Sequence, residues 1–139
     1  MSQCVRVVVE NCSTAKELVL EWSTLNEGSW TAPLPEVISG TGEFATQSDG
    51  YALGVAGSAR YRIIGHEDQR LGTVGVTWHA PFVESGTFEA WVASSPTSGR
   101  DFVIGLSTDV DAGTELRIVL RDNQGDAAHG FTHRQCVAA

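Results

Sequence analysis

Apolar and polar residues alternate with a period of two along most of this chain. In the first run, Val5, Val7 and Val9 alternate with Arg6 and Glu10. Such alternation predicts β-strands buried on one face, because successive side chains of a strand point to opposite sides. The runs that predict strands cover residues 5–9, 18–22, 42–48, 55–64, 71–78, 88–93, 102–107 and 116–120.

The segments between these runs contain turn-forming residues. Asn26-Glu27-Gly28 and Ser48-Asp49-Gly50 each end a strand, and two prolines make residues 28–40 a loop. No segment has the spacing of an amphipathic helix. About eight short strands joined by turns predict an all-β, antiparallel β-sandwich. We expect residues 1–139 to form a single domain, in which 122–139 is a final irregular strand or a tail.

Strand alternation also assigns the tryptophans to faces. Trp22 falls on the same face as Leu18, and Trp78 continues the face of Val76, so Trp78 is expected in the core. Trp91 falls on the face opposite Phe88 and is expected to point outward. Pro81 ends the strand that carries Trp78, because proline has no amide hydrogen to donate.

Composition and charge exclude several classes of function. The 139-residue chain has 17 acidic and 9 basic residues, a net charge of -8, and no basic cluster. A surface of this sign repels phosphate backbones and anionic lipids, so we expect no nucleic-acid partner. No apolar run approaches the roughly 20 residues of a membrane-spanning helix. The N-terminus lacks the basic region of a signal peptide, so we expect a cytoplasmic protein or one released without such a peptide.

The three cysteines do not have metal-binding spacing. Cys4 and Cys12 lie near opposite ends of the first strand, so we expect no bond between them. A bridge from this strand to Cys136 is one alternative. Without an export signal, we expect three reduced thiols.

Three stretches of the chain resemble the actinoporin-like β-sandwich superfamily and, within it, the aegerolysins. The first is a strand ending at Glu10-Asn11, followed by a strand that reaches Gly28-Ser29-Trp30. The second is the glycine-rich segment 48–63, SDGYALGVAGSARYRI. The third is Trp78-His79-Ala80-Pro81-Phe82, an aromatic–x–x–Pro–aromatic element.

The resemblance implies a protein that recognises membrane lipid, sphingolipid above all, and that acts in a cytolytic system with a pore-forming partner or by self-association. Actinoporins cross the membrane with an N-terminal helix. Here the first strand begins near Val5, and the few residues before it cannot span about 30 Å of hydrocarbon. Ala80 and Phe82 replace the cysteine and the second tryptophan that usually flank the aegerolysin proline. The alternative is a carbohydrate-binding lectin of the fungal fruit-body type on the same fold.

Four aromatic residues are the candidate ligand-binding side chains. Trp30 follows a Gly-Ser turn, Phe82 lies beyond Pro81, and Trp91 points outward. Tyr51 is the fourth, as a ring able to stack on a sugar. Aromatic rings of this kind settle at the depth of lipid headgroups or stack on ligands, although each could also merely cover the sheet.

We expect no metal, no cofactor and no catalytic activity. Asp109, Asp111 and Glu115 are spaced like calcium ligands, but a solvated hairpin explains them better. The pair His129 and His133 would bind a metal only on a helix, which Gly130 disfavours. His66 and His79 are isolated, and no nucleophile motif or phosphate-binding loop occurs in the sequence.

Overall fold

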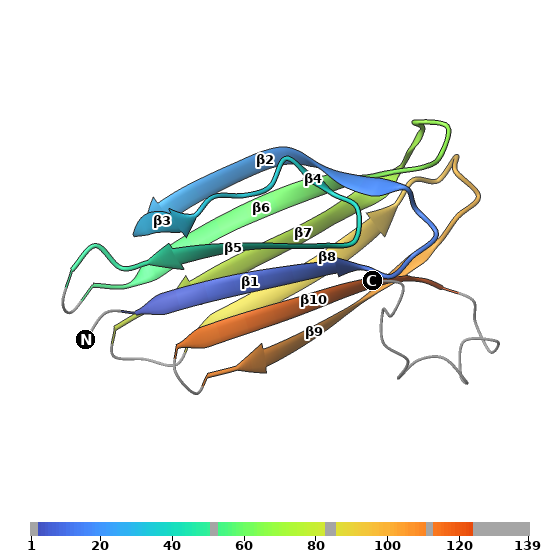
Figure 1. Cartoon of the computed structure of the whole chain (residues 1–139). Coiled ribbons are helices and arrows are strands. Elements are labelled where there is room, and N and C mark those ends of the chain that lie inside the picture. Colours follow the sequence, from blue (N-terminus) through green and yellow to red (C-terminus); the bar gives the residue numbers. More distant parts are fainter. Residues whose placement is uncertain (1–2, 51–52, 83–85, 111–112, 124–139) are drawn as a thin grey trace.

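The computed structural model describes residues 3–50, 53–82, 86–110 and 113–123, which form an all-β sandwich (Figure 1). This confirms the predicted fold class. Among the described residues there are ten strands where about eight were expected. They are β1 (Cys4–Asn11), β2 (Glu17–Glu27), β3 (Ser29–Ala32), β4 (Val37–Ile38), β5 (Thr41–Gln47), β6 (Val55–Ile64), β7 (Arg70–Ala80), β8 (Thr87–Ser94), β9 (Phe102–Asp109) and β10 (Thr114–Asp122). The described part contains no helix long and apolar enough to cross a membrane.

Each of the two sheets has five strands. Sheet A has the order β3-β5-β1-β10-β9, and sheet B has the order β4-β2-β6-β7-β8. The pairs in both sheets are antiparallel except for β1 and β10, which run parallel with Val7 opposite Leu116. Residues 55–63 of the glycine-rich segment 48–63 form most of β6, the central strand of sheet B. The connections between the long strands therefore lie at the two opposite ends of the sandwich (Figure 1).

The core lies between the inner faces of the sheets. Trp78 is only 1% exposed and packs against Phe44 of the other sheet with ring centroids 5.6 Å apart. The core position predicted for Trp78 is thus confirmed. Tyr61 is buried as well, and its hydroxyl donates a hydrogen bond of 2.6 Å to the carbonyl of Pro35. Burial raises the pKa of Tyr61 because the phenolate would be poorly solvated.

The segment 28–40 differs from the predicted loop. It contains β3, which pairs with β5, and the two-residue β4, which pairs with the start of β2. Strands this short show too few alternating positions to be found by pattern. Val37 of β4 is exposed while Ile38 is buried, so even this two-residue strand has an inner and an outer face.

Trp22 lies on the outer face of sheet B, and its predicted place beside Leu18 is wrong. The register of β2 against β6 shifts between Leu20 and Trp22, so that Leu20 faces Tyr61 whereas Trp22 faces Arg60. A bulge adds one residue to a strand and moves the residues after it to the opposite face. Trp22 is accordingly 43% exposed, whereas Leu18 is fully buried.

The cysteines also correct an expectation. Cys12 is disulfide-bonded, and its partner lies outside the described residues, as does Cys136. Cys4 is a free thiol, so Cys4 and Cys12 do not pair with each other, as predicted. The expectation of three reduced thiols is wrong. It rested on the absence of an export signal, and that absence does not determine whether the fold brings another cysteine close enough to bond with Cys12. The predicted tail also lies outside the described residues from position 124 onward, and Asp122 ends β10.

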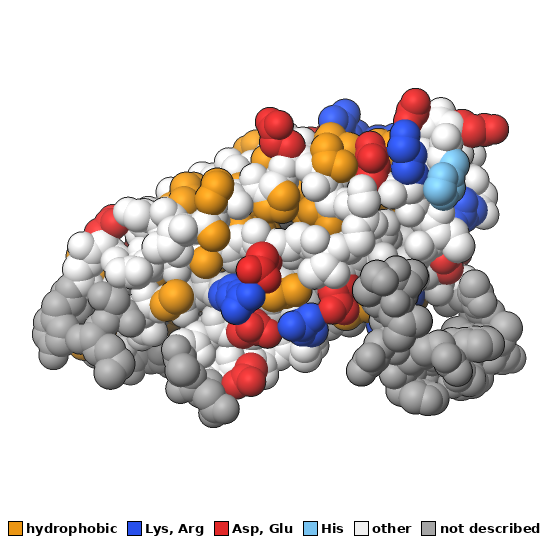
Figure 2. Space-filling view, in the orientation of Figure 1, with side chains coloured by type: hydrophobic (Ala, Val, Ile, Leu, Met, Phe, Trp, Pro, Cys, Tyr) orange, Lys and Arg blue, Asp and Glu red, His pale blue; other side chains and the backbone are white. Residues whose placement is uncertain are grey.

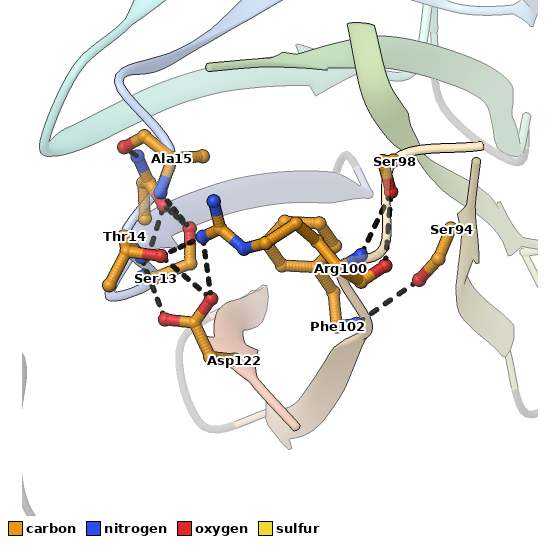
Figure 3. A network of polar contacts seen from close by, with 9 residues as sticks. Ser13, Thr14, Ala15, Ser94, Ser98, Arg100, Phe102 and Asp122 are labelled. Atoms are coloured by element: carbon orange, nitrogen blue, oxygen red, sulfur yellow. Dashed lines mark hydrogen bonds and ion pairs between the residues drawn. The ribbon is translucent and has the colours of Figure 1, made fainter. Parts of the chain in front are cut away.

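A polar cluster closes the end of the sandwich where the β1–β2 and β8–β9 connections lie (Figure 3). The carboxylate of Asp122 accepts hydrogen bonds from the backbone amide of Thr14 at 2.8 Å and from its hydroxyl at 2.9 Å. The guanidinium of Arg100 donates to the same carboxylate at 3.2 Å and also to the Thr14 hydroxyl. Asp122 thus joins the end of β10 to two connections that are remote in the sequence.

Candidate functional site

Three exposed apolar side chains lie at the opposite end of the sandwich, one on each of three connections. Leu53 lies between β5 and β6, Phe82 between β7 and β8, and Val110 between β9 and β10. They are 49%, 37% and 66% exposed, respectively. Figure 1 shows these three connections at the same end of the molecule, beside the N-terminus. We call this end, defined by Leu53, Phe82 and Val110, the apolar end.

Contacts to the backbone of Pro81 and Phe82 hold the β7–β8 connection in place at Phe82. The side-chain amide of Gln3 donates to the carbonyl of Pro81 at 3.1 Å and to that of Phe82 at 3.4 Å. On the other side, a Cβ added to Gly54 would lie 3.1 Å from the Cα of Pro81, so the β5–β6 and β7–β8 connections touch. Phe82 is exposed, as a candidate ligand-binding side chain must be, and hydrogen bonds from the side chain of Gln3 hold its backbone.

The two ends differ in charge. The connections 48–54, 81–86 and 110–113 contain three acidic residues, Asp49, Glu84 and Asp111, and no lysine or arginine. At the other end, Lys16 lies 2.9 Å from Asp68 and Arg100 lies 3.2 Å from Asp122. Figure 2 shows basic, acidic and histidine side chains gathered at that end. The lysine and arginine side chains that the structure describes therefore lie at the opposite end or on the faces of the sheets.

Trp30 is not the turn residue that the sequence predicted. It lies in β3, is half-buried, and packs edge-on against Phe44 and Trp78, each with ring centroids 6.0 Å away. Trp30 thus extends the aromatic core toward the edge of sheet A. A side chain held by two core rings is poorly placed to leave them for a ligand.

Trp91 lies outward, as predicted, in the middle of β8. It is 38% exposed and faces Gly75 of β7 across the ladder. Trp91 follows Thr87, the first residue of β8, by four positions. That spacing is a rise of about 13 Å along the strand, away from the apolar end. The structure therefore does not bring Trp30, Phe82 and Trp91 together as one patch. Tyr51, the fourth candidate, lies outside the described residues.

The acidic residues of the β9–β10 hairpin have other partners. Asp109 and Glu115 face each other across this hairpin, as expected for a connection between two strands. Glu115 lies 3.8 Å from the guanidinium of Arg6 and 3.4 Å from that of Arg117. Asp111 lies outside the described residues, as do His129 and His133. His79 lies 3.9 Å from Glu27.

Two residues of the apolar end, Leu53 and Val110, were not among the predicted candidates. Leu53 follows Tyr51 and Ala52 directly before Gly54, and Val110 stands between Asp109 and Asp111. The sequence signal for them is weak: both apolar residues lie outside the predicted strands 55–64 and 102–107, although each is in phase with the alternation of the neighbouring strand. Which connections meet at one end depends on the topology, which the sequence pattern does not contain.

No protein-family model matches this chain, and no curated protein matches it in sequence. Among solved structures, the chain is similar to the RahU protein in its crystal structure with a Tris molecule. The TM-score is 0.62 at 15% sequence identity, and the match covers 89% of this chain and 98% of RahU. RahU has an aegerolysin-type fold. At this identity the likeness shows the fold alone, and it agrees with the sandwich architecture implied by the resemblance in sequence.

Proposed function

We propose that this protein binds the surface of lipid membranes through its apolar end. The observation that carries the proposal is the position of Leu53, Phe82 and Val110, three exposed apolar side chains on three connections at one end. Isolated exposed apolar residues are ordinary on protein surfaces, whereas apolar side chains gathered at one end offer a surface for binding. The opposite end is closed by ion pairs such as that of Lys16 and Asp68.

Shallow insertion of these side chains provides the driving force. Burying one phenylalanine, leucine or valine side chain fully contributes about 1.5–3 kcal/mol, so partial burial of three contributes several kcal/mol. This is enough for reversible attachment without basic residues. The fixed backbone of Phe82 reduces the entropy lost on binding, because the Gln3 hydrogen bonds already hold the connection.

The charge of the apolar end selects the kind of headgroup. The three connections carry Asp49, Glu84 and Asp111 and no lysine or arginine, so an anionic surface is repelled. Zwitterionic headgroups, such as those of sphingomyelin or phosphatidylcholine, present an ammonium group that carboxylates attract. Phe82 adds a ring of the kind that settles at headgroup depth. In this proposal the protein is a binding protein and not an enzyme, and membrane damage requires self-association or a pore-forming partner.

Cosedimentation with vesicles tests the proposal. Vesicles of sphingomyelin, phosphatidylcholine and cholesterol are compared with vesicles in which part of the phosphatidylcholine is replaced by phosphatidylserine. We expect binding to the first and weaker binding to the second. Phe82→Ser should weaken binding to the neutral vesicles about three- to tenfold, since tenfold corresponds to about 1.4 kcal/mol. The triple variant with Leu53→Ser and Val110→Ser should lose binding.

The matched control is Val37→Ser. Val37 is 49% exposed, like Leu53, but lies in β4 beside the start of β2, at the other end of the sandwich. It should leave vesicle binding unchanged. Absence of binding to both vesicle types, or equal binding by the triple variant and the original chain, would show that the apolar end does not bind membranes.

A further inference from the structure

A row of four residues crosses the outer face of sheet B. Trp22 of β2 faces Arg60 of β6, Arg60 faces Gly75 of β7, and Gly75 faces Trp91 of β8. We call these four residues the outer row. Two half-exposed tryptophans thus flank an exposed arginine on one sheet face, away from the apolar end.

The guanidinium of Arg60 is held on an aromatic ring. Its central carbon lies 4.8 Å from the centroid of the Trp22 indole, a cation–π contact. The bulge between Leu20 and Trp22 places the indole on the outer face, where it meets Arg60, because in a regular strand Trp22 would point inward. The ring supports the cation without neutralising its charge.

The indole of Trp91 extends from β8 over β7, toward Arg60. A Cβ built on Gly75 would lie 2.2 Å from Cε2 of this indole, so the ring occupies the space that a side chain of residue 75 would fill. Trp91 and Arg60 are thus the two cross-strand neighbours of Gly75 on this face, with the indole of Trp91 lying over β7 and Arg60 on the strand beyond it. Next to the row, the hydroxyls of Ser58 and Thr77 lie 3.2 Å apart, and Thr77 faces Glu89.

Arg60 and Arg62, both on the outer face of β6, have no acidic partner among the described residues. Two arginines of sheet A differ in this respect. Arg6 lies 2.7 Å from Glu43, and Arg117 lies 2.6 Å from Glu10. Figure 2 shows basic and acidic side chains next to one another over β1 and β10.

Arg62 also has a buried Nε without a hydrogen-bond partner in the described part of the chain. Its neighbour across the ladder, Thr73, accepts a hydrogen bond from Arg70, whose guanidinium lies 3.3 Å from Glu21. Glu21 is thus already paired with Arg70. Within the described ranges, Arg60 and Arg62 therefore share one strand face and have no carboxylate partner, in a chain of net charge -8.

We propose that the outer row binds a sugar that carries one carboxylate, such as a uronic or sialic acid at the end of a glycan. The exposed indole of Trp91 provides the stacking surface, because the negative face of an aromatic ring attracts the C–H groups of a pyranose. Arg60 binds the carboxylate, as guanidinium groups do with two parallel hydrogen bonds. Ser58, Thr77 and Glu89 lie where sugar hydroxyls need partners.

The charges of the protein favour a single carboxylate over a polyanion. The chain carries a net charge of -8, and this field repels heparin or nucleic acid as a whole. A ligand with one charge meets little of that repulsion and can still pair with Arg60. A neutral sugar would leave the guanidinium of Arg60 without its ionic partner.

Saturation-transfer NMR of the full chain with glucuronate tests this site. The neutral methyl ester of glucuronate has nearly the same shape and isolates the contribution of charge. We expect millimolar binding of glucuronate and at least tenfold weaker binding of the ester. Arg60→Gln and Trp91→Ala should each weaken glucuronate binding at least tenfold, and Arg60→Lys, which keeps the charge but not the planar fork, should fall between.

The control Arg117→Gln removes an arginine from the outer face of sheet A and should leave glucuronate binding unchanged. Equal binding of glucuronate and its ester, or full binding by Arg60→Gln, would overturn the proposal. Competition by inorganic sulfate as strong as that by glucuronate would also overturn it, because it would show a general anion site. Vesicle binding and glucuronate binding test the two proposals separately. Loss of glucuronate binding by variants of the outer row should leave vesicle binding unchanged. Loss of vesicle binding by variants of the apolar end should leave glucuronate binding unchanged.

Discussion

Trp91 covers Gly75 on the outer face of sheet B, and no other residue type fits beneath the indole. A methyl group at position 75 would lie 2.2 Å from Cε2 and 2.3 Å from Cζ2 of the ring. Real Cβ atoms do not approach other atoms this closely, so a larger residue must displace the indole. Gly75 is thereby linked to the exposure of a tryptophan on the next strand.

Gly75→Ala is therefore expected to push the Trp91 ring into solvent. We expect a red shift of tryptophan emission, stronger quenching by acrylamide, and a loss of about 1–2 kcal/mol in the free energy of unfolding. Gly105→Ala is the matched control, because a Cβ at that strand position meets no atom within 4 Å. It should leave fluorescence unchanged and stability equal or slightly higher. Identical spectra for the two variants would contradict the position of Trp91.

The period-two pattern predicted most of the fold, since a buried face imposes alternation on each strand. Trp78 and Trp91 were assigned to the correct faces in this way. The pattern failed at Trp22, because a bulge reverses the faces of the residues that follow it, here up to a second register shift after Leu25, and leaves no mark in a short run of apolar positions. It also failed for β3, because a strand of four residues shows too few alternating positions and is defined by its pairing with β5.

The candidate site was predicted less well than the fold. Phe82 could be identified because a proline before it ends a strand, but Leu53 and Val110 become significant only when the topology places their connections at one end. Trp30 is the opposite case, a predicted binding residue that belongs to the core. The preceding Gly28 and Ser29 indicated a turn, whereas the contacts of the ring with Phe44 and Trp78 place it in the core. Contacts between residues far apart in sequence decide both cases.

The buried hydroxyl of Tyr61 should make the free energy of unfolding fall as the pH rises above 10. Tyr61→Phe removes the hydrogen bond to Pro35 and is expected to cost about 1 kcal/mol at pH 7. Burial raises the pKa of Tyr61 above the ordinary value of 10.0. Above pH 10 the unfolded chain loses this proton while the folded chain keeps it, so the original protein loses up to about 1.4 kcal/mol of stability per pH unit. Below pH 10 this contribution is fully present.

Urea unfolding of both chains at pH 7 and pH 11 measures this effect. The advantage of the original chain over Tyr61→Phe should shrink to about zero at pH 11, as the hydrogen bond is offset by the proton linkage. Other groups that titrate, such as Lys16, are common to both chains and cancel in the difference. A constant difference between pH 7 and pH 11 would show that Tyr61 ionises equally in the folded and unfolded states.

The carboxylate of Asp122 should stabilise the sandwich more than the exposed ion pairs do. Its side chain is only 16% exposed, and it accepts hydrogen bonds from Thr14 and Arg100 (Figure 3). Asp122→Asn keeps the shape, removes the charge, and is expected to lower the free energy of unfolding by about 1–2 kcal/mol. Glu43→Gln, which breaks the exposed pair with Arg6, should change it little. Chemical unfolding of the two variants at pH 7 compares them, and a larger loss for Glu43→Gln would be the contrary result.

Variants of Trp30 and Phe82 distinguish a residue that stabilises the core from one that binds membranes. Because its ring packs on Phe44 and Trp78, Trp30→Ala leaves a cavity, and we expect a loss of about 2 kcal/mol, less than the roughly 3–5 kcal/mol of a fully buried aromatic residue. Vesicle binding by the folded fraction should stay unchanged. Phe82→Ser should do the reverse, keeping stability and weakening binding. Unfolding curves and cosedimentation measured on the same preparations test this, and weaker vesicle binding by a stably folded Trp30→Ala would assign Trp30 to the membrane surface instead of the core.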